Sequence, residues 1–270
     1  GDSAARLPAR VSPFVLRRGT AAVVADLPET IEDTVMAQLT GEQRKLYLAN
    51  QDRIAQQVQH REASEFKKDK LKVLAELTKL RQICCDPRLH YEDYKAGSAK
   101  LDACMELVHG ALDGGHHILL FSQFTGMLDI IGKRLAKEDI AFLKLTGASS
   151  KESRAKMVAQ FQAGEVPVFL ISLKAGGVGL NLTAADVVIH YDPWWNVAAQ
   201  DQATDRAHRI GQQHTVTVYK LISKDTIEER IMQMQESKRD LVNSVLGGDG
   251  ISSALFTRED VLALLGGDGR

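Results

Sequence analysis

The stretch VFLISLKAGGVGLNLTAADVVIHYDPWWNVAAQDQATDRAHRIGQQ, residues 168–213, decides the fold. It contains two short apolar runs, Val168–Leu173 and Asp186–Tyr191, joined by a glycine-rich loop. Strands that are covered on both faces read as continuous apolar runs, whereas half-exposed strands alternate apolar and polar residues. The two runs therefore predict inner strands of a parallel sheet, and the carboxyl ends of such strands border the ligand crevice.

The loop between these runs carries Gly176, Gly177 and Gly179. Glycine lets backbone N–H groups approach an anion or a sugar-phosphate chain closely, because it has no side chain in the way. A tight turn between two strands would use the same residues, and glycine loops are often structural punctuation. By itself the loop leaves both interpretations open.

Arg206 and Arg209 follow in the polar part of the stretch, three residues apart. If Val197–Ile210 is helical, the two side chains share a face and can reach one charged target. A forked guanidinium suits the charge that develops on a phosphoryl group during its transfer. The alternative is a solvated helix face paired with Asp201 or Asp205, which is the commoner use of an arginine pair.

The strings DPWWN and QATDRAHRIGQ together resemble the last motifs of the Swi/Snf-type ATPases of helicase superfamily two. Members of that family are DNA translocases with two RecA-like lobes. The resemblance covers nearly the whole chain and identifies it with the second, C-terminal lobe. It implies that Arg206 and Arg209 act on the γ-phosphate of ATP bound to the first lobe, and that closure driven by ATP moves the lobes along the duplex.

The resemblance also implies contacts with nucleotide and with the backbone of double-stranded DNA. On the nucleotide side the residues are Gly177, Gly179, Leu180, Asn181 and Gln202. On the DNA side they are Ser122, Gln123, Thr146, Gly147, Ser172, Lys174, Ala175, Gly176, Trp194, Trp195 and Asn196. Backbone contacts of this kind carry no sequence information, as a motor that moves along DNA requires. For Ser122 or Thr146 alone, helix capping or turn formation is the commoner role.

The rest of the chain predicts an α/β architecture, because strands alternate with helices. We expect a RecA-like doubly covered parallel sheet with additional N-terminal and C-terminal helices. The expected segments are a linker over 1–20, a strand and helices over 21–96, the lobe over 97–235 and bracing helices over 236–270. Early helices are expected over 40–46 and 71–83. Capping boxes are expected at Thr40 with Gln43, Ser149 with Glu152, and Asp225 with Glu228.

Composition limits the class of protein. The net charge is -1, so DNA binding would come from a local patch. Three cysteines in no paired spacing argue for a reducing compartment, and the histidines fall in no metal spacing, so we expect no structural metal. No apolar run approaches the roughly 20 residues that span a bilayer, so no membrane contact is expected. Alanine-rich helices without long charged insertions favour a bacterial cytoplasmic, nucleoid-associated protein over a nuclear one.

ATP hydrolysis of this type needs a phosphate-binding loop, G-x-x-x-x-G-K-[ST], and an acidic residue that holds magnesium. Neither motif is in the sequence, since Gly132-Lys133 lies in a predicted helix and is followed by Arg134. We therefore expect ATP and Mg²⁺ to be bound mainly by the first lobe, and this chain alone to be inactive. The expected partners are double-stranded DNA, the first lobe and a DNA-bound protein as remodelling target. Two alternatives stay open: a non-catalytic module that binds nucleic acid or a partner, and a lobe of a strand-separating helicase.

Overall fold

The structure is a computed structural model that describes residues 14–15, 27–172, 180–193, 197–234 and 257–267, with the backbone alone over 14–15 and 197–200. The described residues form two compact units that are not continuous in sequence. One unit draws on Gly1–Met36, Asp102–Trp194 and Ala198–Leu221, and the other on Ala37–Leu101, Trp195–Val197 and Ile222–Arg270. The segment boundaries expected at residues 20, 96 and 235 stay predictions.

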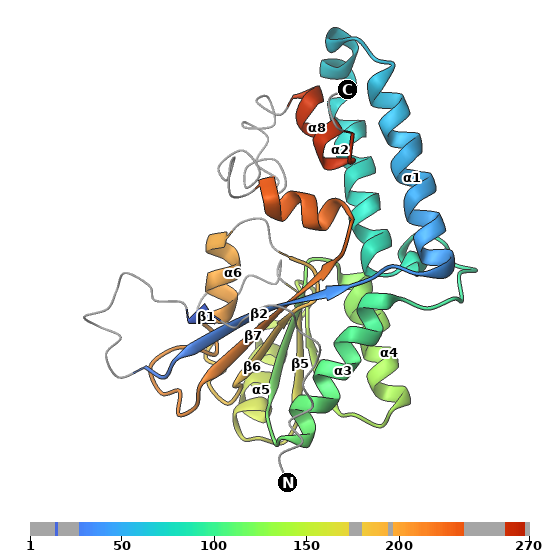
Figure 1. The fold of residues 1–270 in the computed structure, drawn as a ribbon. Coiled ribbons are helices and arrows are strands. Elements are labelled where there is room, and N and C mark those ends of the chain that lie inside the picture. The colour runs from blue at the N-terminus through green and yellow to red at the C-terminus, as the bar shows by residue number, and fades with distance from the viewer. Residues whose placement is uncertain (1–13, 16–26, 173–179, 194–196, 235–256, 268–270) are drawn as a thin grey trace. The chain divides into compact units, whose positions relative to one another are not determined.

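The first unit is built on a sheet (Figure 1). Its strands in the described part of the chain are β1 (Phe14–Val15), β2 (Thr30–Ala37), β3 (Ile118–Ser122), β4 (Phe142–Leu145), β5 (Val168–Ser172), β6 (Val187–His190) and β7 (Val216–Ser223). Their spatial order is β1-β2-β7-β6-β3-β5-β4. Strands β4, β5, β3, β6 and β7 pair in parallel, and β1 is antiparallel to β2. The N–H groups of Val216 and Lys224 donate to the carbonyls of Glu29 and Ala37, so β2 also runs parallel to β7.

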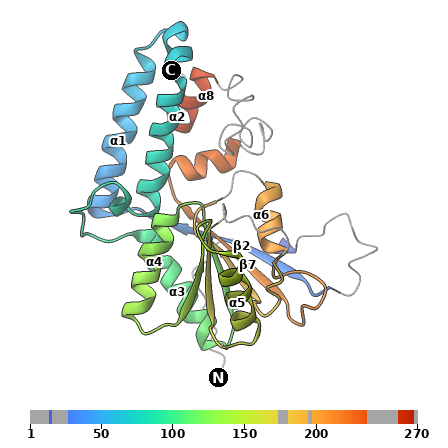
Figure 2. The ribbon, with the colours of Figure 1, turned by 180° about the vertical axis from the view of Figure 1, so that it is seen from behind.

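Helices cover both faces of this sheet (Figures 1 and 2). Alternate strand residues point to opposite faces. On one face, Phe121, Ile171 and their neighbours pack with Phe161 of α5 (Lys151–Gln162). On the other, α4 (Thr125–Lys137) approaches β4 and β5 so closely that a Cβ at Gly132 would lie 3.0 Å from the Phe142 ring. The helix α3 (Ala99–Asp113) precedes β3. The predicted doubly covered parallel α/β sheet is confirmed.

The second unit is helical. It contains α1 (Gly41–Gln59), α2 (Ala63–Cys85), the short η1 (Pro87–Leu89), a helical stretch over 227–234 and α8 (Arg258–Leu264). Its core is one cluster in which Tyr47 and Ile54 of α1 meet Leu77 and Leu80 of α2, together with Ile227 and Val261. Both long helices extend beyond the expected 40–46 and 71–83, because polar residues dilute their apolar stripes in the sequence.

The three expected capping boxes are absent. Thr40 makes no side-chain cap bond, because the Gln43 amide instead donates to the Ile83 carbonyl and accepts from the Ala99 N–H. Helix α5 is capped by Ser150, one residue later than expected, while the Ser149 hydroxyl accepts from Thr146. The Glu228 carboxylate accepts from Ser223 and Lys100 instead of from Asp225. Gln43 and Glu228 are thus taken by partners far along the chain, Ile83 and Lys100, whereas Ser149 is taken by a nearby turn.

Within the described residues, no helix is both long and apolar enough to cross a membrane.

Candidate functional site

The carboxyl ends of the parallel strands bring several predicted residues to one edge of the sheet. Ser122 at the end of β3 lies opposite Ser172 of β5, and Phe121 lies opposite His190 of β6. Leu145, which precedes the predicted Thr146-Gly147 pair, lies opposite Ile171 of β5. The loops that follow these strands therefore border a common edge, where ligands of open α/β sheets bind.

The two motif arginines do not lie on a helix. Helix α6 (Val197–Thr204) ends before them, and residues 205–211 form turns and bends, so the condition that Val197–Ile210 is helical is not met. We call residues 205–212 the arginine turn. Gly211 in this turn has a φ of +103°, a conformation that residues with a side chain rarely adopt. Glycine is therefore the residue type that this point of the turn, seven residues after the end of α6, favours.

The arginine turn is bound to the loop 180–185 at several points. The Arg206 carbonyl accepts from the Leu182 N–H at 2.9 Å, and Nη1 of Arg209 donates to the Leu180 carbonyl at 3.2 Å. The buried Gln212 amide donates to the carbonyls of Thr183 (3.1 Å) and Ala185 (2.7 Å). The turn and the loop are therefore held as one piece. Sequence reasoning missed Gln212, whose partners lie about 27 residues away in the chain and leave no local pattern.

The Arg206 side chain lies over an aromatic platform. Its guanidinium carbon is 5.7 Å from the centroid of the Phe121 ring, which stacks on His190 at 5.5 Å and 19°. Nη1 of Arg206 is buried and has no hydrogen-bond partner, and no carboxylate pairs with Arg206 in the part of the chain that the structure describes. The expected alternative of an ion pair with Asp201 or Asp205 is thus not what Arg206 makes. A buried cationic donor without an acceptor is a place where an anion is favoured.

The charges of Arg206 and of the ring platform beneath it also favour binding of an anion. Burial lowers the pKa of Arg206 below its ordinary value, and repulsion from Arg154 lowers it further. The guanidinium still carries its proton at neutral pH. Burial also lowers the pKa of His190 to about 3, and Lys220 adds to this effect. The platform under Arg206 is therefore neutral, and Arg206 keeps an uncompensated positive charge.

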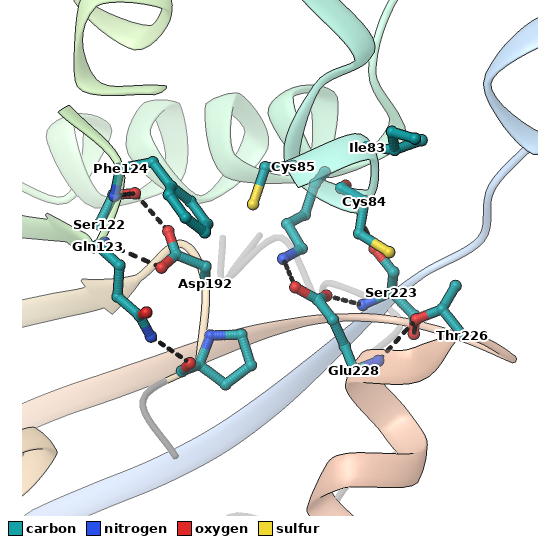
Figure 3. A network of polar contacts seen from close by, with 12 residues as sticks. Ile83, Cys84, Cys85, Ser122, Gln123, Phe124, Asp192, Ser223, Thr226 and Glu228 are labelled. Carbon is teal, nitrogen blue, oxygen red and sulfur yellow. Dashed lines mark hydrogen bonds and ion pairs between the residues drawn. The ribbon is translucent and has the colours of Figure 1, made fainter. Parts of the chain in front are cut away.

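Asp192, which sequence reasoning did not single out, organises the loop after β3 (Figure 3). Its side chain is 1% exposed and accepts from the Ser122 hydroxyl and, at 2.9 Å, from the Gln123 N–H. The Gln123 amide donates to the Pro193 carbonyl at 3.0 Å, and the Ser122 hydroxyl also accepts from Phe124. The loops after β3 and β6 are thereby joined. In this arrangement the Ser122 hydroxyl bonds within the loop and does not point to solvent.

We predict that Asp192→Asn lowers the free energy of unfolding by about 1 to 3 kcal/mol, because an amide cannot accept from both donors. We also expect about fivefold weaker binding of duplex DNA by the full-length protein, measured by fluorescence anisotropy. The matched control is Asp186→Asn at the amino end of β6, whose carboxylate likewise accepts from a side chain, His116, and a backbone N–H, His117. Equal losses of DNA affinity in both variants would contradict a specific role for Asp192.

The remaining predicted residues fall into four groups. Thr146 and Gly147 form a turn in which the Thr146 hydroxyl accepts from Ala148, and Gly147 is exposed. Ser172 is buried with a hydroxyl that has no partner. Asn181 and Gln202 are exposed. The others lie outside the described residues: Lys174, Ala175, Gly176, Gly177, Gly179, Trp194, Trp195 and Asn196.

No group of three or more His, Cys, Asp or Glu side chains within the described ranges could hold a metal ion. Cys84, Cys85 and Cys104 are buried, and none of the three is in a disulfide. The donors at the site are thus guanidinium, amide and hydroxyl groups, which suit phosphate oxygens.

Comparison with known proteins shows which family has this fold and sequence. Residues 99–211 match the helicase conserved C-terminal domain, and residues 1–89 match the SNF2-related domain. The core of the Sulfolobus solfataricus SWI2/SNF2 ATPase in complex with dsDNA is 36% identical, with a TM-score of 0.73 over 92% of this chain and 53% of that one. The C-terminal domain of a Sulfolobus solfataricus SWI2/SNF2 ATPase is 33% identical, with a TM-score of 0.69 over 86% of this chain and 96% of that domain. The chain belongs to the Snf2-type helicases.

Curated relatives of this Snf2-type lobe are much longer than the chain. An uncharacterized ATP-dependent helicase of Mycoplasma pneumoniae is 40% identical over 257 residues, which are 94% of this chain and 24% of that protein. The putative ATP-dependent helicase/translocase YwqA of Bacillus subtilis is 38% identical over 259 residues, which are 92% and 28%. The chain thus spans about a quarter of these relatives and corresponds to the C-terminal lobe of a Snf2-type motor domain.

Proposed function

We propose that this Snf2-type lobe is the second motor lobe of an ATP-dependent translocase on double-stranded DNA. The observation that carries the proposal is Arg206, a half-buried cation with an unpaired N–H at the carboxyl edge of the sheet. In the proposal, Arg206 and Arg209 stabilise the charge that develops on the γ-phosphate of ATP bound to the first lobe. A preorganised guanidinium is effective in this role because it needs little reorganisation when the charge appears.

The nucleotide side of the proposal extends from the arginine turn to the loop 180–185. Arg209 donates to the Leu180 carbonyl. A shift of its guanidinium toward a phosphate would therefore break this bond, and in the proposal it would change the position of Leu180, which follows Gly177 and Gly179 in the sequence. Asn181 and Gln202 are exposed and available for contact with the nucleotide or the first lobe. ATP and its magnesium would be held mainly by the first lobe, which supplies the phosphate-binding loop that this sequence lacks.

The DNA side of the proposal uses the loops at the same edge. The Asp192-centred loop would hold Ser122 and Gln123 in place beside a DNA phosphate, and the exposed turn at Gly147 would lie against the same backbone. Ser172, Lys174, Ala175, Gly176, Trp194, Trp195 and Asn196 complete the proposed set. A solved relative bound to dsDNA, at 36% identity, supports this assignment. Because the net charge is only -1, affinity would come from this edge and fall as salt rises.

A translocation assay tests the proposal. We expect the full-length protein with ATP to displace a third strand from a triplex while leaving the underlying duplex paired. Separation of the duplex strands in the same reaction would assign the lobe to a strand-separating helicase. Binding of DNA without ATP turnover or displacement would assign it to a non-catalytic binding module. Either of these two results overturns the proposal.

The same proposal indicates the class of biological target but not its identity. A motor that tracks the backbone of a duplex displaces or repositions proteins bound to it, so we propose a protein-DNA complex as the substrate. The similarity to Mycoplasma and Bacillus proteins supports a bacterial protein that works in the cytoplasm at the nucleoid. If the source is eukaryotic, we propose a nuclear location instead.

A further inference from the structure

The helical unit contains a cavity at the turn that joins α1 to α2. Its volume is about 500 Å³, and its lining comes from the end of α1, the start of α2 and the start of α8. Figures 1 and 2 both show α8 beside these two helices. All the lining residues belong to the helical unit, whereas Arg206 and Arg209 belong to the unit built on the sheet. The proposed phosphate chemistry therefore gives this cavity no role.

Contacts between the helices hold the walls of the cavity in place. Arg258 at the start of α8 donates to the carbonyls of Val58 at 2.9 Å and of Gln59 at 2.6 Å, near the end of α1. Phe66, which is 4% exposed, lines the cavity and also belongs to the hydrophobic core of this unit. The cavity is therefore a concave surface with fixed walls and an aromatic ring in its lining, which is the kind of surface that receives a side chain of a ligand or partner.

Two lysines without an ion-pair partner line the cavity. Lys67 and Lys70 are three residues apart on α2, and neither forms an ion pair within the described ranges. The carboxylates in the lining, Glu62 and Glu259, are exposed and pair with neither lysine. Burial lowers the pKa of Lys70, repulsion from Lys67 lowers it further, and attraction to Asp260 opposes both effects. The two ammonium groups are therefore available to an anionic ligand.

An exposed apolar side chain lies beside these lysines. Leu71 is 79% exposed and follows Lys67 by four residues, so the two side chains share a face of α2. A ligand that suits this surface carries negative charge for the lysines and apolar groups for Leu71 and Phe66. Duplex DNA offers a convex row of phosphates without apolar side chains, whereas an acidic peptide offers both kinds of group. The charge and shape of the surface therefore favour a peptide.

We infer that this cavity docks an acidic segment of a partner protein, with carboxylates at Lys67 and Lys70 and an apolar side chain inserted beside Phe66. The inference goes beyond the proposed motor function and does not depend on it. Because no residue of the cavity takes part in the proposed phosphate chemistry, loss of docking should leave ATP turnover unchanged.

Fluorescence anisotropy with the full-length protein tests the inference. The probe is a labelled peptide of about twelve residues, made of glutamates with one phenylalanine and one leucine at its centre. We expect a Kd of about 10 to 100 µM, and binding at least about tenfold weaker when serine replaces both apolar residues. The double variant Lys67→Glu with Lys70→Glu should also bind at least about tenfold more weakly. The matched control reverses the charges of Lys68 and Lys72, which are exposed on α2 outside the cavity lining, and should bind nearly as the wild type does.

A further variant, Ala63→Trp, tests the cavity without a change of charge. Ala63 is exposed and lines the cavity, so we expect the added ring to occupy the space and to abolish peptide binding. The Tm and the DNA-stimulated ATP turnover of this variant should stay at their wild-type values, because the substitution removes no buried contact.

Failure of the peptide to bind would overturn the inference, as would equal losses in the two double variants or normal binding by Ala63→Trp. If the Lys67 and Lys70 variant binds duplex DNA more weakly than its matched control does, the lysines belong to a DNA surface and the inference is also overturned. None of these results bears on Arg206, so the inference and the proposed function fail separately.

Discussion

Replacement of Arg206 by alanine in the full-length protein is expected to lower DNA-stimulated ATP turnover by about 1,000-fold or more. The reason is that this guanidinium, held over Phe121 with an unpaired buried N–H, is positioned to meet the charge on a phosphoryl group. Affinity for duplex DNA should change by less than about threefold, because removal of one charged contact at most weakens a binding surface made of many. Turnover is measured by phosphate release at saturating DNA, and affinity by anisotropy.

Two further variants make the Arg206 result specific. Arg206→Lys should recover only part of the turnover, since a lysine restores the charge but not the forked donor. Arg134→Ala on α4 is the control, because its guanidinium pairs with Glu138 at the surface and has no role in the proposed chemistry. Arg209→Ala should lose turnover and also loosen the loop at Leu180, which amide exchange would detect. Wild-type turnover in Arg206→Ala would remove Arg206 from the mechanism.

Replacement of Lys100 by methionine is expected to lower the free energy of unfolding of the helical unit by about 3 to 5 kcal/mol. Nζ of Lys100 donates to the Glu228 carboxylate at 2.7 Å, and the two side chains are 0% and 1% exposed. The second carboxylate oxygen accepts from the Ser223 N–H at 2.8 Å, in the network drawn in Figure 3. Loss of the ammonium therefore leaves a buried carboxylate without its counter-charge. Urea denaturation followed by far-UV circular dichroism measures the change.

The double variant Lys100→Met with Glu228→Gln should recover much of that loss, because glutamine carries no charge and still accepts from Ser223. Lys144→Met is the matched control, since Lys144 pairs with Asp129 at the surface, where the side chains are 39% and 55% exposed. That pair should contribute less than about 1 kcal/mol. Equal destabilisation by Lys100→Met and Lys144→Met would show that burial of the Lys100 pair has no special weight.

The parallel sheet was predictable because its strands carry their signal locally. The runs around Phe169 and Val188 are continuously apolar, and burial on both faces requires that composition. The alternation of strands and helices along the rest of the chain then indicates a parallel sheet and places the loop ends at one edge.

The finer parts of the site depend on contacts between distant residues, which no local pattern records. Helix α6 ends at Thr204, and the turn that follows it is held by the bond from Gln212 to the Ala185 carbonyl, so the two arginines do not share a helix face. Asp192 and His190 act through contacts with the neighbouring strand β3 and the loop after it, and neither residue type by itself indicates such a role. The misplaced caps have the same cause, as Gln43 shows by contacting Ile83, 40 residues away.

One measurement tests the central claim most directly: ATP turnover, with and without duplex DNA, for the full-length protein and for the 270-residue chain alone. We expect turnover that duplex DNA stimulates in the full-length protein and none in the isolated lobe, because the proposed function places the phosphate-binding loop and the arginines on different lobes. Turnover by the isolated lobe, or a full-length protein that binds duplex DNA yet hydrolyses no ATP, would contradict it.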